Sequence, residues 1–107
     1  MKNKKIAIKI KFDKNFIFFV EEDEKKGRVE WYDINKILIE TNDSGPLDND
    51  LNFIISTLEF DVYISGELSG TDELLKIFQS FSNFNNAAVI EAVSSIESKL
   101  FLLWEKD

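Results

Sequence analysis

The segment with the clearest pattern lies near the start of the chain, where apolar and polar side chains alternate. The apolar positions are Ile6, Ile8, Ile10 and Phe12, and they are interleaved with Lys5, Lys9 and Lys11. Because successive side chains of a strand point to opposite faces, this period of two predicts a half-buried strand over residues 5–12. We expect the isoleucines and Phe12 to face the core and the lysines to face solvent.

Further segments have the composition of strands and are separated by polar turns. They are residues 16–20 (FIFFV), 29–32 (VEWY), 37–39 (ILI), 60–66 (FDVYISG) and 99–106 (KLFLLWEK). A bend near Asn35 is expected between the second and the third, so these two are one bent strand or two strands. With the first segment, the pattern predicts about five to six strands.

Residues 46–58 have apolar side chains at helical spacing. From Leu47 they recur at i, i+4, i+7, i+8 and i+11, which is one stripe of a helix. Pro46 suits the first helical position. Asp48 and Asp50 would then lie in the first turn, where the helix dipole favours carboxylates by about 0.3–1 kcal/mol each. The sequence therefore predicts a helix over this segment.

Two further helices are expected in the second half of the chain. Thr71 is the predicted N-cap of one, with Asp72 and Glu73 in its first turn and apolar residues 74, 75, 78 and 81 on one face. Residues 87–98 fit a helical stripe better than an alternation, although a strand stays open there. At 107 residues the chain has the length of one domain. We therefore expect a single α+β domain over residues 1–107, a mainly antiparallel sheet with two to three helices packed on it.

The composition argues against an enzyme. The chain has no His and no Cys, which excludes Ser–His and Cys–His nucleophilic catalysis and removes the usual zinc ligands. The spacing Asp48-x-Asp50-x-Asn52 matches the start of an EF-hand loop, but Phe53 stands where that loop needs glycine. We therefore predict no catalytic residues, no metal and no cofactor.

Three other classes of ligand are also not expected. Residues 65–71 (SGELSGT) run from a strand into a helix but lack the lysine of a phosphate-binding loop. The lysines at positions 5, 9 and 11 form one basic strand face, but the net charge of −7 argues against nucleic acid. No apolar run has the length of a membrane span, and lysines interrupt the N-terminal apolar stretch, so the expected location is the cytoplasm.

Charge is distributed unevenly along the chain. Residues 1–30 have a net charge of +3, residues 31–107 have a net charge of −10, and residues 37–75 contain no basic residue. Helix starts and solubility explain part of this acidic excess, but uncompensated like charge destabilises a compact state. The acidic segment is therefore either tolerated drift that leaves only a solvated surface, or a surface for a basic partner with an aromatic anchor, and we take the second as our prediction. The predicted contact residues are Glu40, Asp43, Asp48, Asp50, Glu59, Asp61, Glu67, Asp72 and Glu73, with Tyr63 as anchor and Trp31 and Tyr32 as further aromatic candidates.

In size, acidity and lack of catalytic residues, the chain resembles the immunity proteins of bacterial toxin systems, including those of contact-dependent growth inhibition. This resemblance implies a cytoplasmic protein that neutralises a basic, nuclease-type toxin by covering its active site. Two alternatives belong to other classes: a phage-type inhibitor that mimics nucleic acid, and a structural or assembly subunit with an apolar surface patch. An enzyme would instead require a concave site with converging polar groups.

Overall fold

The computed structural model describes residues 2–42 and 51–107. Within these residues the strands are β1 (Asn3–Phe12), β2 (Phe16–Glu21), β3 (Lys26–Glu30), β4 (Lys36–Thr41), β5 (Asn52–Ser56), β6 (Phe60–Ser65) and β7 (Lys99–Glu105). The helices α1 (Thr71–Phe78) and α2 (Asn86–Val93) lie between β6 and β7, and a 3-10 turn, η1 (Trp31–Asp33), joins β3 to β4.

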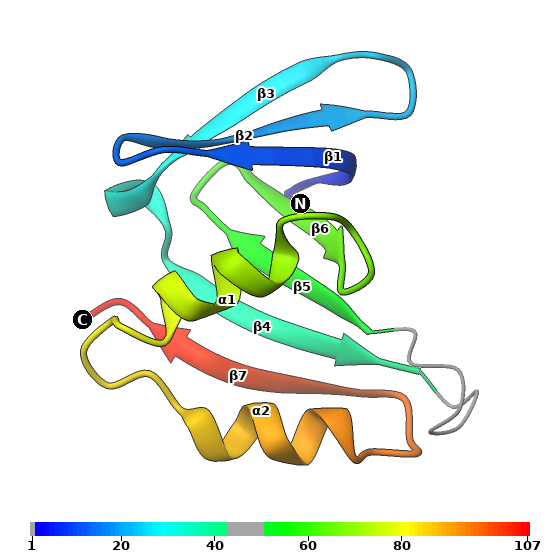
Figure 1. Cartoon of the computed structure of the whole chain (residues 1–107), viewed down its shortest axis with the longest axis vertical. Coiled ribbons are helices and arrows are strands. Elements are labelled where there is room, and N and C mark those ends of the chain that lie inside the picture. Colours follow the sequence, from blue (N-terminus) through cyan, green and yellow to red (C-terminus); the bar gives the residue numbers. More distant parts are fainter. Residues whose placement is uncertain (1, 43–50) are drawn as a thin grey trace.

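All seven described strands form one sheet in the order β3, β2, β1, β6, β5, β4, β7 (Figure 1). Neighbouring strands are antiparallel except for β1 and β6, which are parallel. This confirms the predicted α+β class and the mainly antiparallel sheet. The described part of the chain has more strands than the five to six that we expected.

The additional strand is β5, and it overturns the helix predicted over residues 46–58. Residues 43–50 lie outside the described residues, but Asn52–Ser56 pairs with both β4 and β6. Phe53 and Ile55 point into the core while Ile54 is buried on the opposite face. Because side chains on both sides of β5 are buried, its residues form a continuous apolar run, and their agreement with helical spacing was a coincidence.

The first strand contains an irregularity that changes which side chains face the core. The pairing of β1 with β2 shifts between Ala7 and Lys9, as at a β-bulge. Before the shift Ala7 is buried, while Ile6 is 56% exposed and Ile8 42% exposed. Beyond it, Ile10 packs against the core as expected. The prediction of one inward isoleucine face was therefore wrong for the first half of β1, because an extra residue reverses the alternation.

Both helices cover the same face of the sheet (Figure 1). Helix α1 begins after Gly70, whose φ of 93° is the left-handed conformation that glycine tolerates. Thr71 is thus the first helical residue and not the predicted cap, and its Oγ1 donates a hydrogen bond to the Ser65 carbonyl at 3.1 Å. Helix α2 has Asn85 as its N-cap and packs against β7 and β4. This confirms a helix over the first part of residues 87–98.

The core lies between this helical layer and the sheet. Leu74 and Phe78 of α1 are fully buried against strand residues such as Ile37 and Ile64. A chain of edge-to-face ring contacts continues from Phe78 toward one end of the molecule and includes Trp31, Phe81 and Trp104. Because the helices bury only one face of the sheet, the composition of the other face bears on function.

Candidate protein-interaction surface

The sheet face turned away from the helices carries a continuous apolar row, and we call it the open face. Five residues are successive cross-strand partners on β1, β6, β5, β4 and β7, and therefore lie side by side: Ile6, Tyr63, Ile54, Leu38 and Leu102. Strands are about 4.8 Å apart, so the row crosses about 19 Å of sheet.

The ends of this row are open to solvent while its centre is not. Ile6 and Leu102 are 56% and 45% exposed, and Leu100 beside Glu40 is 56% exposed. Ile54 at the centre is only 4% exposed because its neighbours flank it on both strands. Scattered surface aliphatics are ordinary, but a contiguous row of them indicates an interaction site.

Polar residues border the apolar row on both sides. On one side the cross-strand partners are Lys4, Asp61, Ser56 and Lys36, and on the other they are Ser65, Asn52 and Glu40. Apolar centres with polar rims are the usual anatomy of protein interfaces. Three residues of the predicted contact set, Glu40, Asp61 and Tyr63, therefore lie together on this face.

Tyr63 is held in an ordered environment on the open face. The Lys4 Nζ lies 4.2 Å from the centre of its ring, a cation–π contact. Partial burial raises the pKa of Tyr63 above its ordinary value of 10.0, and the nearby carboxylates of Glu40 and Asp61 raise it further. The phenol is thus neutral at pH 7 and retains a hydrogen-bond donor beside the aliphatic row.

Asp61 has an incompletely satisfied carboxylate. Lys2 Nζ lies 3.5 Å from its Oδ1 and donates its short hydrogen bond, 2.6 Å, to Ser56 Oγ instead. Among the described residues, no donor forms a hydrogen bond to Asp61 Oδ1 although this oxygen is buried. A buried acceptor without a donor costs free energy. Because this oxygen is covered, the charge of Asp61 acts on a partner through space and not through a direct contact of Oδ1.

The other described acids of the predicted set do not join the open face. Glu59 is exposed in the β5–β6 turn, at the opposite end of the sheet from Glu67, Asp72 and Glu73. These three lie where β6 ends and α1 begins, and there the N–H of Gly66, the neighbour of Glu67, donates to the Leu51 carbonyl at 2.9 Å. Asp43, Asp48 and Asp50 lie outside the described residues. The structure thus divides the acidic set into separate groups.

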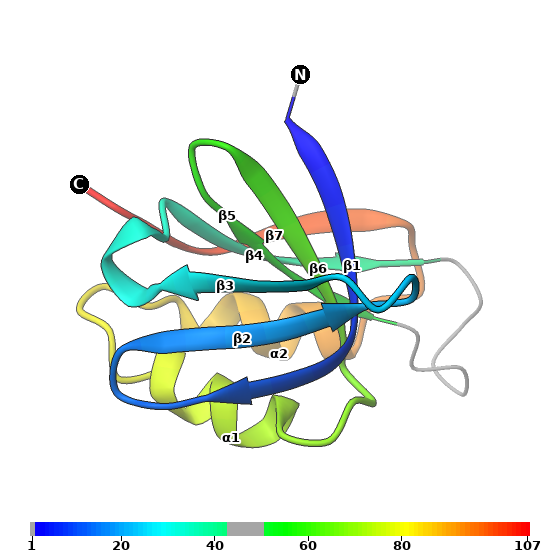
Figure 2. The ribbon, with the colours of Figure 1, turned by 90° about the horizontal axis from the view of Figure 1, so that it is seen from above.

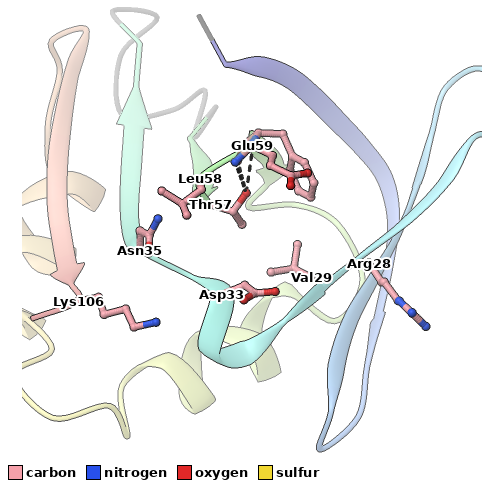
Figure 3. A pocket seen from close by; sticks show the side chains of 9 residues that line it. Arg28, Val29, Asp33, Asn35, Thr57, Leu58, Glu59 and Lys106 are labelled. Carbon is pink, nitrogen blue, oxygen red and sulfur yellow. Dashed lines mark hydrogen bonds between the residues drawn. The ribbon is translucent and has the colours of Figure 1, made fainter.

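A cavity of about 350 Å³ lies beside Glu59, between the β3–η1–β4 connection and the β5–β6 turn (Figure 3). Two of its polar side chains, those of Thr57 and Lys106, bind the protein itself. Thr57 Oγ1 accepts from Glu59 N and Phe60 N, and Lys106 Nζ donates to the Tyr32 carbonyl. Arg28 points away from the cavity in Figure 3. Since Thr57 and Lys106 bind within the protein and Arg28 points away, we take the open face as the stronger candidate.

Sequence reasoning missed the aliphatic residues of the open face. Ile6 was expected to face the core, Ile54 was assigned to a helix, and Leu38 and Leu102 carry no local signal. Only the cross-strand register brings them into one row. A register comes from tertiary pairing, so no spacing in the sequence could have identified this surface.

Comparisons with protein-family models, with curated proteins and with solved structures find no match. Within residues 2–42 and 51–107, no three metal-ligating side chains are grouped closely enough to hold a metal ion. The helices of this part of the chain are too short to cross a membrane.

Proposed function

We propose that this protein is a binding protein of the immunity type, which neutralises a basic, nuclease-type toxin domain by covering its active site. The observation that carries this proposal is the grouping of Glu40, Asp61 and Tyr63 around the exposed aliphatic row of the open face. The row supplies apolar contact area, Tyr63 supplies a rigid anchor, and the two carboxylates attract cations.

One end of the open face favours a basic partner, whereas at the other end lysines pair with the carboxylates. Lys2 and Lys4 reach the open face at Asp61 and Tyr63, and Lys36 pairs with Glu105 at 3.4 Å. Glu40 has no ion pair among the described contacts and lies at the same end of the sheet as Glu67. Complementary charge there would speed the encounter, whereas the apolar row would slow dissociation.

Self-assembly is a second candidate function, and the same face favours it. Lys36 and Glu40 lie two residues to either side of Leu38 on β4. A two-fold axis along the apolar row would therefore place Lys36 of one copy opposite Glu40 of the other, with the aliphatic rows in contact. Such a self-complementary patch is what an isologous dimer requires.

The test is a capture experiment with matched variants. Immobilised protein is exposed to lysate of the source organism and eluted in steps of rising salt, and bound proteins are identified by mass spectrometry. The Ile6→Ser/Leu102→Ser variant removes the exposed ends of the row, and Leu58→Ser/Ile90→Ser removes two aliphatics of at least equal exposure elsewhere. We expect the wild type and the control variant to capture a basic protein. The affinity of the open-face variant for that protein should be at least about tenfold lower than that of the wild type.

Two results would decide against this function. The captured protein, once purified, must lose its activity when the wild type is added in equal amount, and an unaffected activity would contradict inhibition. If light scattering shows a dimer that the Ile6→Ser/Leu102→Ser variant abolishes, and no basic protein is captured, the self-assembly function replaces it.

A further inference from the structure

A second surface differs from the open face in composition and lies on the three strands at the β3 edge of the sheet. We call it the basic–aromatic face. It is the outer side of β1, β2 and β3 and consists of Lys9, Lys11, Phe16, Phe18, Lys26 and Arg28. Figure 2 looks onto these strands, with the helices behind them.

The strand register interleaves cations and rings on this face. Lys11, Phe18 and Arg28 are successive cross-strand partners, so Phe18 lies between two cations. In the adjacent row, Lys9 and Lys26 flank Val20 in the same manner. All of these side chains point away from the core, since the residues that alternate with them, such as Ile17 and Phe19, are buried.

The cations of this face form no ion pairs within the described part of the chain. Its ion pairs involve Lys2, Lys5, Lys25 and Lys36, and no carboxylate lies within 4.0 Å of Lys9, Lys11, Lys26 or Arg28. All four are exposed. Arg28 lies over the Phe16 ring, with 4.6 Å from its Cζ to the ring centre, and the Phe16 and Phe18 ring centres are 5.6 Å apart.

Acidic groups border this face without covering it. Glu30 is the cross-strand partner of Phe16, and Glu22 and Asp23 lie in the turn between β2 and β3. Asp72 and Glu73 belong to α1, on the other side of the sheet. Glu30 lies on this face and the Asp13 carboxylate interacts with Lys11, so these acids offset part of the four positive charges. Since charges are screened over about 10 Å at 0.1 M salt, these nearby groups govern binding there more than the net charge of the chain does.

We infer that the basic–aromatic face binds single-stranded nucleic acid. Lys9 and Lys11 lie two residues apart on β1, and Lys26 and Arg28 do so on β3. These cations, on the two strands that flank β2, can contact successive phosphates. The Phe18 ring between them can stack on a base, the combination that single-strand-binding surfaces use. This inference is independent of the open face. The net charge of the chain led us to expect no binding to nucleic acid. That expectation considered only the lysines of β1, whereas the structure places cations and rings of β2 and β3 beside them.

The test is fluorescence anisotropy with a labelled single-stranded RNA of about 15 nucleotides and mixed sequence. The wild type is expected to bind with a Kd on the order of 10⁻⁵ M, weakening steeply as salt rises. Lys11→Glu should weaken binding by about tenfold and reduce the salt slope by about 0.7. Lys76→Glu on α1 is the matched control, with the same net charge, and should bind as the wild type does.

The aromatic contribution is tested separately. Phe18→Leu keeps an apolar side chain but removes the ring, and it should weaken binding by about tenfold with the salt slope unchanged. Lys26→Glu repeats the charge test from a different strand. Circular dichroism verifies that each variant is folded.

Several outcomes would overturn the inference. Absence of binding at about 25 mM salt would do so, as would equal losses for Lys11→Glu and Lys76→Glu. Heparin, a polyanion without bases, is the second probe. If heparin binds as tightly as the RNA and Phe18→Leu changes neither, the face attracts polyanions without recognising bases. Binding to vesicles of anionic lipid but not to RNA would assign it to a membrane surface instead.

Discussion

Tyr63 shows how a single side chain on the open face depends on its neighbours. Its ring contacts Lys4, and the charges of Glu40 and Asp61 act on its hydroxyl. Partial burial is the largest cause of its raised pKa, and the two carboxylates add to it. Tyr32, the other tyrosine of the chain, is 71% exposed, and a hydrogen bond to Glu30 is the main cause of its raised pKa. The two phenols can therefore be separated by substitution.

A pH titration tests this environment. Because the folded-state pKa of Tyr63 is raised, its stabilising contribution is complete below about pH 10 and is lost as pH rises through the folded pKa. In a Tyr32→Phe background, the absorbance of tyrosinate reports Tyr63 alone. Glu40→Gln should move that titration to lower pH, whereas Glu59→Gln, in the distant β5–β6 turn, should leave it in place. Equal curves for all three proteins would mean that Glu40 does not act on Tyr63.

At the scale of elements, the β2–β3 hairpin depends on an aromatic ring packed over a glycine. Gly27 is the cross-strand partner of Phe19, which is 2% exposed. A Cβ on Gly27 would lie 2.4 Å from Phe19 Cζ and 2.8 Å from Cε2. The requirement for glycine here is steric and not conformational, because Gly70 is the only glycine with a positive φ among the described residues. The ring covers the glycine backbone and fixes how the hairpin packs.

Gly27→Ala should therefore lower the free energy of unfolding by about 1–3 kcal/mol through overpacking. Lys26→Ala, on the outward side of the same strand, should change it by less than about 0.5 kcal/mol. Chemical denaturation measures both. Adding Phe19→Leu to Gly27→Ala should cost less than the sum of the two single changes, because the smaller side chain gives room to the new methyl group. Strict additivity would show that the ring is not the obstacle.

At the scale of the whole molecule, charge is more unbalanced than the described ion pairs can compensate. In the segment 37–75, which has nine acids and no basic residue, Asp61 alone has a described ion pair, with Lys2. The described ion pairs are solvent-accessible, and exposed pairs contribute little, about 0–1 kcal/mol each. Repulsion among the acids should therefore outweigh the attraction within these pairs.

Screening this repulsion should stabilise the protein. We expect the melting temperature to rise by about 2–5 °C between about 20 mM and about 500 mM NaCl. Glu67→Lys introduces a cation into the acidic segment and should reduce that rise. Glu91→Lys makes the same change of net charge on α2, outside the segment, and should reduce it less. A melting temperature that falls with salt would show that the ion pairs outweigh the repulsion.

Local patterns in the sequence were sufficient for several elements. The turn residues and apolar composition of residues 16–20, 60–66 and 99–106 predicted β2, β6 and β7, and the helical stripe after Thr71 predicted α1. These signals are local, since strand alternation and helical spacing record how one element meets the core. The α+β class and the unequal charge of the two chain segments likewise follow from the sequence alone.

The tertiary structure decided what the sequence pattern could not. Three consecutive buried residues, Phe53, Ile54 and Ile55, fit a helix or a two-sided strand equally well, and pairing with β4 and β6 selected the strand. The bulge in β1 turned Ile6 outward. The open face and the basic–aromatic face both consist of residues from several strands, and register alone brings these residues together. The sequence by itself therefore determined the class of fold and the sign of its charges. The pairing of distant strands determined which side chains share a face, because register depends on contacts across the whole sheet.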